Sequence, residues 1–452
     1  MKIIIAGDGK VGSTLARELS AEGYDLTVID SQQEVLENTM EKYDVITVDG
    51  NCATMNTLQQ AGVESADMLI AATGADELNL LCCVTAHCMN EKLHTIARIR
   101  NPEYSDQAYR MRGEFALSMT VNPERQTAKE IERLLSLPGF LRRDTFAKGR
   151  VEIVELRLDA KSRLAGVALH GLNSIVKCKV LVCAVLRDGQ VSMPRGSFVL
   201  LPGDRIYVTA PTQELVTLLK NLGIITHRVS RVMIAGGGRL SYYLAAQLTR
   251  DDMHVQIVEK DHDRCVELAG MLPEVSVIQG DASSQSLLER EGLGACDAFV
   301  SLTGLDETNL MLSMYATSIG VPQVITKLSR LESSPLLDSL PIGSVVYPRE
   351  LVCNSIVRYV RAVKNQVGAA ISIHTIAAGQ AEATEYLVDE TTLHCGEPLR
   401  KLKLRPNVLI ACINHKGDIE IPGGDSVFAE GDTIILVTSA STVIGQLNEI
   451  FV

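Results

Sequence analysis

The feature that most constrains this 452-residue chain is a glycine-rich motif that occurs twice, 229 residues apart. In each copy an apolar run suited to a buried parallel strand turns on closely spaced glycines into a helix. A second apolar strand then ends in an acidic residue, 23 positions after the first glycine. This order predicts a dinucleotide-binding βαβ unit in duplicate. The motif residues are Gly7, Gly9, Gly12 and Asp30 in the first copy, and Gly236, Gly238, Ser241 and Glu259 in the second.

The repeat extends well beyond the glycines. Residues 70–79 match residues 300–309, and both segments contain the pattern Thr-Gly-x-Asp-Glu-x-Asn, which begins at Thr73 and at Thr303. Residues 95–100 likewise match residues 324–329. Strands and helices that alternate in this way predict a doubly wound parallel sheet, with its ligand at the carboxyl ends of the strands.

Each repeat continues into a helical segment and then into a region of different composition. The helices are expected at 123–137 and 349–367, either as packing helices or as arms exchanged between subunits. Strands with period-two alternation follow, such as residues 151–158, and turns containing glycine separate them. We therefore expect an α/β fold with two Rossmann-like doubly wound parallel sheets, each followed by a small α+β domain. The expected domains are 1–144, 145–228, 229–369 and 370–452.

Composition narrows the function classes. A net charge of −12 and a pI near 5.3 argue against a nucleic-acid partner, whose phosphates would be repelled. A strand begins at Lys2 without the pattern of a signal peptide. The longest uncharged stretch, 308–326, contains Asn309, Gly320 and Pro322, so we expect that the chain does not cross a membrane. The eleven cysteines show no zinc-ligand spacing, and no metal site is expected.

The first glycine motif has the residues that a dinucleotide requires. Gly7 permits the tight turn, Gly9 lets the backbone approach a pyrophosphate, and Gly12 lets the helix pack closely on the strand. Backbone N–H groups at the helix N-terminus would hold the phosphates. Asp30 can accept hydrogen bonds from both ribose hydroxyls, which favours NAD over NADP. The alternative is a glycine turn without a ligand.

The second motif departs from this pattern. Ser241 replaces the third glycine, so we expect helix and strand to lie slightly further apart. Arg239 follows the second glycine, either as a phosphate contact or as a solvated surface residue. Glu259 can still bind a ribose with a longer reach. Occupancy of the second cleft is therefore open, and its ligand can differ from that of the first.

Two further positions bear on the ligand and the chemistry. Arg98 ends the fifth strand and suits terminal phosphates, so it favours ATP or ADP as well as NAD; the alternative is a pairing with Asp76 or Glu77. The nine histidines show no recurring partner, and the small domains have no nucleophile motif. A dehydrogenase needs a positioned acid or base near the nicotinamide, so an NAD-dependent oxidoreductase remains only the second hypothesis. A scaffold with vestigial clefts is the third.

Over essentially its full length, the chain resembles the TrkA family, the cytosolic regulatory subunits of bacterial Trk potassium uptake systems. Their paired units are RCK (KTN) domains, each followed by a TrkA-C domain. The resemblance implies a regulatory protein rather than an enzyme, in a ring docked peripherally on the inner face of the cell membrane. Its partner would be an integral potassium transporter of the TrkH or TrkG kind. NAD or NADH, and ATP or ADP, would bind the clefts, and nucleotide-dependent hinging would be passed to the pore. We expect a homotetramer, because four chains supply eight nucleotide-binding units for a closed ring.

The resemblance also implies which residues line the clefts. The departures at Ser241 and at Lys327, which stands where Arg98 stands in the first copy, weaken the second site. The first cleft would be lined by Gly7, Asp8, Gly9, Lys10, Val11, Gly12, Asp30, Thr73, Gly74 and Arg98. The second would be lined by Gly236, Gly237, Gly238, Arg239, Leu240, Glu259 and Thr303.

Overall fold

The computed structural model separates into two compact units. Unit 1 comprises residues 1–129, 242–244 and 347–360, and unit 2 comprises the remainder. The structure describes residues 1–137, 139–224, 228–330, 337, 340–364, 370–377, 379–439, 442 and 444–452.

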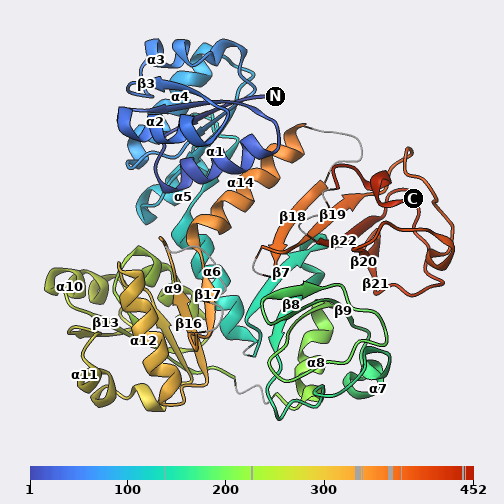
Figure 1. Ribbon diagram of the computed structural model, residues 1–452. Helices are drawn as coiled ribbons and strands as arrows, with labels where there is room; N and C mark the ends of the chain where they lie inside the picture. Colours follow the sequence, from blue (N-terminus) through green and yellow to red (C-terminus); the bar gives the residue numbers. More distant parts are fainter. Residues whose placement is uncertain are drawn as a thin grey trace. The chain divides into compact units, whose positions relative to one another are not determined.

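Unit 1 is built on a six-stranded parallel sheet with the order β3-β2-β1-β4-β5-β6 (Figure 1). The central strands are buried on both faces, as their runs of Ile, Leu and Ala require. The chain order reverses between β1 and β4, so their carboxyl ends form the crevice in which such sheets bind ligands. The strands are β1 (Lys2–Ala6), β2 (Asp25–Asp30), β3 (Ile46–Asp49), β4 (Met68–Ala71), β5 (His94–Arg98) and β6 (Met119–Val121). The helices are α1 (Lys10–Ala21), α2 (Gln33–Lys42), α3 (Met55–Gln60), α4 (Asp76–Met89), α5 (Pro102–Arg110) and α6 (Pro123–Ser136).

A helix from the second half of the chain, α14 (Pro348–Lys364), completes unit 1 (Figure 1). The Ser355 hydroxyl accepts a hydrogen bond from Gln126 at 3.2 Å. The Tyr359 hydroxyl lies 3.2 Å from Nδ1 of His94. Helix α14 also buries an apolar stripe that includes Val352, Ile356 and Val360. The described part of the segment therefore packs against the first half of the same chain; the last expected residues, 365–367, lie outside the described part.

Unit 2 contains a second parallel sheet with the same topology, in the order β14-β13-β12-β15-β16-β17. The repeated sequence pattern therefore produces the same strand order twice. The strands are β12 (Arg231–Ala235), β13 (His254–Glu259), β14 (Ser276–Gln279), β15 (Ala298–Ser301), β16 (Gln323–Lys327) and β17 (Ser344–Val346). The helices are α9 (Arg239–Arg250), α10 (His262–Met271), α11 (Gln285–Arg290) and α12 (Asp306–Ser318).

Unit 2 also contains two five-stranded antiparallel sheets, in the orders β10-β9-β11-β8-β7 and β18-β19-β22-β20-β21. Helices α7 (Leu172–Val176) and α8 (Leu215–Leu222) accompany the first, while the described residues from 370 onward form 3₁₀ turns but no α-helix. The first sheet has β7 (Arg142–Phe146), β8 (Val151–Arg157), β9 (Leu181–Arg187), β10 (Gln190–Ser192) and β11 (Arg205–Pro211). The second has β18 (Ala370–Ile376), β19 (Ala381–Leu387), β20 (Val408–His415), β21 (Asp418–Glu420) and β22 (Thr433–Ser439).

The two antiparallel sheets share one hydrophobic core. Phe146, Ile153 and Tyr207 contribute from the first sheet, and Ala383 and Ile435 contribute from the second. All five side chains are almost completely buried. Burial of apolar area at this interface favours the paired arrangement of the two small domains.

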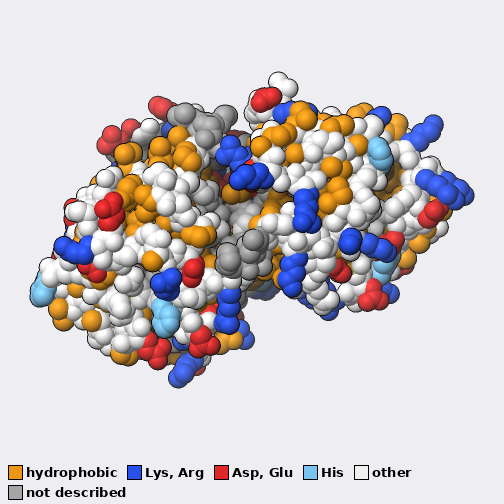
Figure 2. Space-filling view, turned by 90° about the horizontal axis from the view of Figure 1, so that it is seen from below, with side chains coloured by type: hydrophobic (Ala, Val, Ile, Leu, Met, Phe, Trp, Pro, Cys, Tyr) orange, Lys and Arg blue, Asp and Glu red, His pale blue; other side chains and the backbone are white. Residues whose placement is uncertain are grey.

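The described surface is mixed in character. Acidic and basic side chains are both spread over the face seen in Figure 2, with apolar side chains between them. Among the described helices, none combines the length and apolar composition needed to span a bilayer.

Candidate functional site

The first glycine loop is shaped by close backbone contacts. Gly7 has φ +97°, and a Cβ on it would lie 2.8 Å from Cα of Thr73, so only glycine fits there. A Cβ on Gly12 would lie 1.9 Å from the Gly7 carbonyl oxygen, which fixes how closely α1 approaches β1. A Cβ on Gly9 would meet no atom within 4 Å. Gly7 and Gly12 are therefore required by close backbone contacts, whereas Gly9 leaves open space over the loop.

Asp30 closes the same loop from the end of β2. One carboxylate oxygen accepts the N–H of Asp8 at 2.7 Å, and the other accepts the N–H of Gln32 at 3.0 Å. Each carboxylate oxygen can accept a second hydrogen bond. Asp30 therefore holds the loop and still has acceptor capacity for the hydroxyls of a ribose.

Asp8 is an acid whose burial the glycine fingerprint does not predict. It is 2% exposed, and neither carboxyl oxygen has a partner within hydrogen-bonding geometry. Burial raises the pKa of Asp8; the nearby Thr39 hydroxyl partly offsets this, and the Asp30 charge raises the pKa further. Two acids therefore lie together on the β2 side of the first cleft.

The ends of β4 and β5 are joined by a buried asparagine. Oδ1 of Asn79 accepts hydrogen bonds from the N–H and the hydroxyl of Thr73, at 2.8 and 2.7 Å. Its Nδ2 donates to the Arg98 carbonyl at 2.8 Å. Arg98 also donates a guanidinium hydrogen bond to the Thr73 carbonyl, while Asp76 accepts the N–H of Arg100 at 2.8 Å. Thr73 and Arg98 are thus brought together at the carboxyl edge of the sheet.

The second cleft repeats this framework. Gly236 has φ +99°. Glu259 accepts the N–H groups of Gly237 and Asp261, at 2.6 and 2.9 Å, as Asp30 does in the first copy. Asn309 accepts the N–H of Thr303 at 2.9 Å and donates to the Lys327 carbonyl at 3.0 Å. The longer glutamate side chain therefore performs the same loop-closing role.

Three side chains distinguish the second cleft from the first. Ser241 is fully buried, and its hydroxyl donates to the Gly236 carbonyl, the group that Gly12 approaches through its Cα in the first copy. Arg264 donates from Nε to the Gly237 carbonyl at 2.7 Å, and the matching position of the first copy is Val35. Lys327 donates to the Thr303 carbonyl at 2.6 Å.

The remaining expected residues fall into two groups. Lys10 and Arg239 are exposed at the first positions of α1 and α9, whereas Val11 and Leu240 are buried, so the last two can offer a ligand only their backbone. A Cβ on Gly74 or on Gly238 would meet no atom within 4 Å. Sequence reasoning missed the roles of Asn79, Asn309 and Arg264, although the two asparagines occur in the matched repeat.

The loop geometry fits a nucleotide. The first N–H groups of α1 and α9 have no partner within their helices, and the open face over Gly9 and Gly238 leaves the backbone accessible to a pyrophosphate. A separate cavity of about 210 Å³ lies beyond β5 and β6; Ile99, Thr120 and Arg125 are among its lining residues. None of the expected site residues lines that cavity.

Comparison with protein families agrees with the duplicated architecture. The TrkA-N domain matches residues 3–119 and 232–348. The TrkA-C domain matches residues 153–223 and 383–451. Both domains therefore occur twice, in alternation.

Full-length relatives show the same relationship. The chain is 32% identical to the Trk system potassium uptake protein TrkA homolog of Archaeoglobus fulgidus over 452 residues, which is 100% of both chains. It is 31% identical to TrkA homolog 1 of Methanosarcina mazei, over 98% of both chains. It is 29% identical to the Trk system potassium uptake protein TrkA of Haemophilus influenzae, over 100% of this chain and 98% of that protein.

Solved structures share the fold at lower identity. The GsuK RCK domain has a TM-score of 0.61 and 18% identity, with 97% of this chain and 92% of that chain covered. The GsuK channel bound to NAD has the same TM-score and identity, with 97% and 77% covered. GsuK bound to ADP has a TM-score of 0.51 and 14% identity, with 80% and 69% covered. This chain therefore shares the fold of the GsuK RCK domain.

Proposed function

The chain belongs to the TrkA family of Trk system potassium uptake proteins, and we propose that its two clefts regulate a membrane potassium transporter. It acts as a regulatory subunit that binds nucleotides and changes the activity of that transporter through its own conformation. It is not an enzyme. Its place of action is the cytoplasmic face of the cell membrane, where it associates peripherally.

The first cleft binds NAD or NADH. The observation that carries this assignment is the loop-closing carboxylate of Asp30, held at 2.7 Å by the Asp8 N–H beside a glycine turn with an open face. Gly7 to Gly12 present backbone N–H groups to the pyrophosphate, and Asp30 accepts from the ribose. Thr73, Gly74 and Arg98 lie at the adjoining strand ends, where ATP or ADP would place its phosphates.

The second cleft takes a nucleotide of its own through Gly236 to Leu240, Glu259 and Thr303. Support comes from the repetition of the loop-closing hydrogen bonds at Glu259, and from the same Thr–Asn link between strand ends at Thr303. Because Arg264 and Ser241 alter its edges, its nucleotide preference differs from that of the first cleft.

Regulation requires that nucleotides bind one conformation of the assembly better than another. Four chains with two Rossmann units each would close a ring of eight units, which is the arrangement we propose. A ligand that alters the separation of paired clefts then does work on the transporter docked against the ring. The partner is an integral membrane potassium transporter of the TrkH or TrkG kind.

The experiment reconstitutes the full-length protein with the transporter that co-purifies from membranes. Potassium flux is measured with NADH, ATP or ADP, and nucleotide binding to the purified protein is measured by calorimetry. We expect nucleotide-dependent flux that disappears when Asp30 and Glu259 are both replaced by Ala. If flux does not change with nucleotides and no nucleotide binds, the protein would be a scaffold without functional clefts. NADH oxidation by the purified protein with a small carbonyl substrate would instead indicate an oxidoreductase.

A further inference from the structure

Asp144 and His374 occupy the same position in the two antiparallel sheets. Asp144 pairs with Ile153 across β7 and β8, and His374 pairs with Ala383 across β18 and β19. Both members of the second pair lie 230 residues after their counterparts. Asp144 and His374 therefore occupy equivalent positions of the repeat, which holds an acid in the first copy and a histidine in the second.

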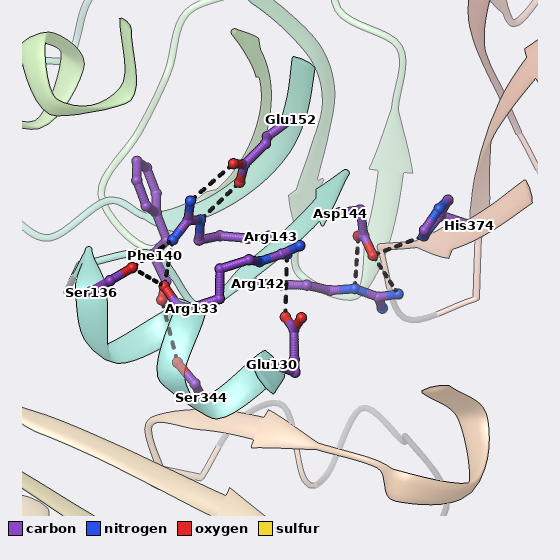
Figure 3. A network of polar contacts seen from close by, with 10 residues as sticks. All are labelled: Glu130, Arg133, Ser136, Phe140, Arg142, Arg143, Asp144, Glu152, Ser344 and His374. Atoms are coloured by element: carbon purple, nitrogen blue, oxygen red, sulfur yellow. Dashed lines mark hydrogen bonds and ion pairs between the residues drawn. The ribbon is translucent and has the colours of Figure 1, made fainter. Parts of the chain in front are cut away.

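These two equivalent residues meet each other. Nδ1 of His374 lies 3.1 Å from Oδ1 of Asp144 (Figure 3). The imidazole packs edge-on against Phe146, with ring centroids 4.6 Å apart. Asp144 is 9% exposed and His374 is 8% exposed, so the contact is closed to solvent.

Contact between equivalent residues is the mark of an approximate twofold axis. Strand β9 also lies against β20, its counterpart in the second sheet. The two sheets thus pack as the halves of a homodimer would, although both belong to one chain. In a true homodimer the residue on such an axis would meet its own copy, and a buried acid would face another acid.

The charged groups around the contact make the pair complementary. Nε of Arg142 lies 2.8 Å from Oδ2 of Asp144, and Glu130 on α6 is close enough to oppose the Asp144 charge. Glu385 on β19 is engaged elsewhere, accepting the Ala147 N–H at 3.3 Å. Burial alone would raise the pKa of Asp144, but Arg142 and His374 together hold it well below its ordinary value. Asp144 is thus an ionised acceptor, and the His374 ring can donate to it.

We propose that Asp144 and His374 form a pairing code by which a first small domain selects a second small domain rather than another copy of itself. A first–first pair would bury two ionised carboxylates, which are acceptors only and cannot hydrogen-bond to each other directly. A second–second pair would place two imidazoles together without a carboxylate. The Asp–His pair joins a ring N–H donor to an ionised carboxylate acceptor.

The test uses full-length chains in an R142A background, so that the guanidinium does not favour one side. H374D creates an Asp–Asp contact, D144H creates a His–His contact, and the double exchange D144H/H374D restores the pair in reverse. Hydrogen exchange of β8 and β19 reports on both sheets of the shared core. We expect each single variant to raise exchange in both strands about tenfold or more. The double exchange should return it to within about threefold of the R142A reference.

Controls separate the pairing code from general damage. H394D alters an exposed histidine of the second small domain, paired with Glu397 at 3.2 Å, and should leave exchange in β8 and β19 unchanged. If a charged single variant fails to fold, D144N and H374N replace it, and each should raise exchange by a smaller factor. A double exchange no better than the worse single variant would overturn the code, as would single variants that exchange like the reference.

Discussion

The two nucleotide clefts agree in their backbone framework and differ in the side chains that line it. In both, an acid at the end of the second strand accepts the N–H of the residue after the first motif glycine, at 2.7 Å for Asp30 and 2.6 Å for Glu259. In both, a buried asparagine links the two strand ends. The differences include Gly12 against Ser241 and Asp8 against Gly237, besides Val35 against Arg264 and Arg98 against Lys327. Both copies have therefore kept the acid that closes the loop and the asparagine that joins the strand ends, and they differ at neighbouring positions.

The residues beside the two loop-closing acids differ in charge. The first cleft has a buried acid, Asp8, beside Asp30. The second has no side chain at Gly237, and Arg264 donates to its carbonyl. A Cβ on Gly237 would lie 2.8 Å from Leu268 and 2.9 Å from Glu259, so an acid at this position would require those two side chains to move. This contrast supports different ligands for the two clefts.

The largest expected effect on stability comes from exchanging the third residue of the glycine motif between the two copies. Gly12→Ser gives the first cleft the residue of the second, but its Cβ would lie 1.9 Å from the Gly7 carbonyl oxygen. Because backbone must move, we expect a loss of about 3 kcal/mol in unfolding free energy, measured by urea denaturation. NAD affinity should fall as well, because the loop shifts.

The reverse substitution is the matched control. Ser241→Gly removes one hydrogen bond, to the Gly236 carbonyl, and adds backbone freedom. We expect a loss of about 1 kcal/mol, clearly smaller than for Gly12→Ser. Equal losses from the two variants would show that the α1 and α9 ends are equally tolerant, and the argument from close approach would be wrong.

Removing the loop-closing acids tests the ligand side of the comparison. Asp30→Ala should weaken NADH binding by about 2 kcal/mol, roughly thirtyfold, because charge-assisted hydrogen bonds to the ribose are lost. Glu259→Ala should leave binding at the first cleft unchanged. Calorimetry on both variants measures each cleft separately, and unchanged NADH affinity in Asp30→Ala would remove NADH from the first cleft.

Much of this framework could be predicted from sequence because it depends on local pattern. The glycine spacing, the acid 23 residues later and the alternation of strands predict both parallel sheets and the loop residues. The repeat strengthens the prediction of two clefts of the same type, since Thr73 and Thr303 occur in the same sequence pattern. Local rules suffice here because strand, turn and helix are neighbours in the chain.

Other features depend on contacts between distant segments, which one sequence does not reveal. The helix α14 follows the second sheet but packs beside His94 of the first. Asp144 and His374 are unremarkable residues of separate strands until the two sheets share a core. Asp8 is buried near Thr39, which lies on α2. No periodicity within a short window contains that information.

The cations at the fifth strands allow a finer test. Arg98 in the first cleft and Lys327 in the second each donate to a threonine carbonyl at a strand end. If Arg98 also senses the γ-phosphate, Arg98→Gln should weaken ATP binding about tenfold and ADP binding by a smaller factor. Arg98→Lys, which copies the second cleft, should retain most ATP affinity. Equal losses for ATP and ADP, with lower thermal stability, would assign Arg98 a structural role only.

The smallest expected effect comes from the two small domains, in which equivalent ion pairs should differ in how their stabilisation depends on pH. Arg187 binds Asp204 through two hydrogen bonds of 2.7 Å, whereas the equivalent His415 in the second domain lies 2.8 Å from Asp432 and 3.0 Å from Glu420. Arginine keeps its charge throughout the physiological range, but histidine does not.

The sign of the pH effect follows from the pKa of His415. The hydrogen bond to Glu420 raises that pKa above its ordinary value of 6.5; partial burial opposes the shift, and Asp432 adds to it. The stabilisation is therefore complete below about pH 6.5 and is lost as the pH rises through the higher pKa of the folded state. We expect a decline of a few degrees in the melting temperature over this range, which His415→Arg should abolish by copying the first domain. A decline that persists in His415→Arg would place its origin elsewhere in the chain.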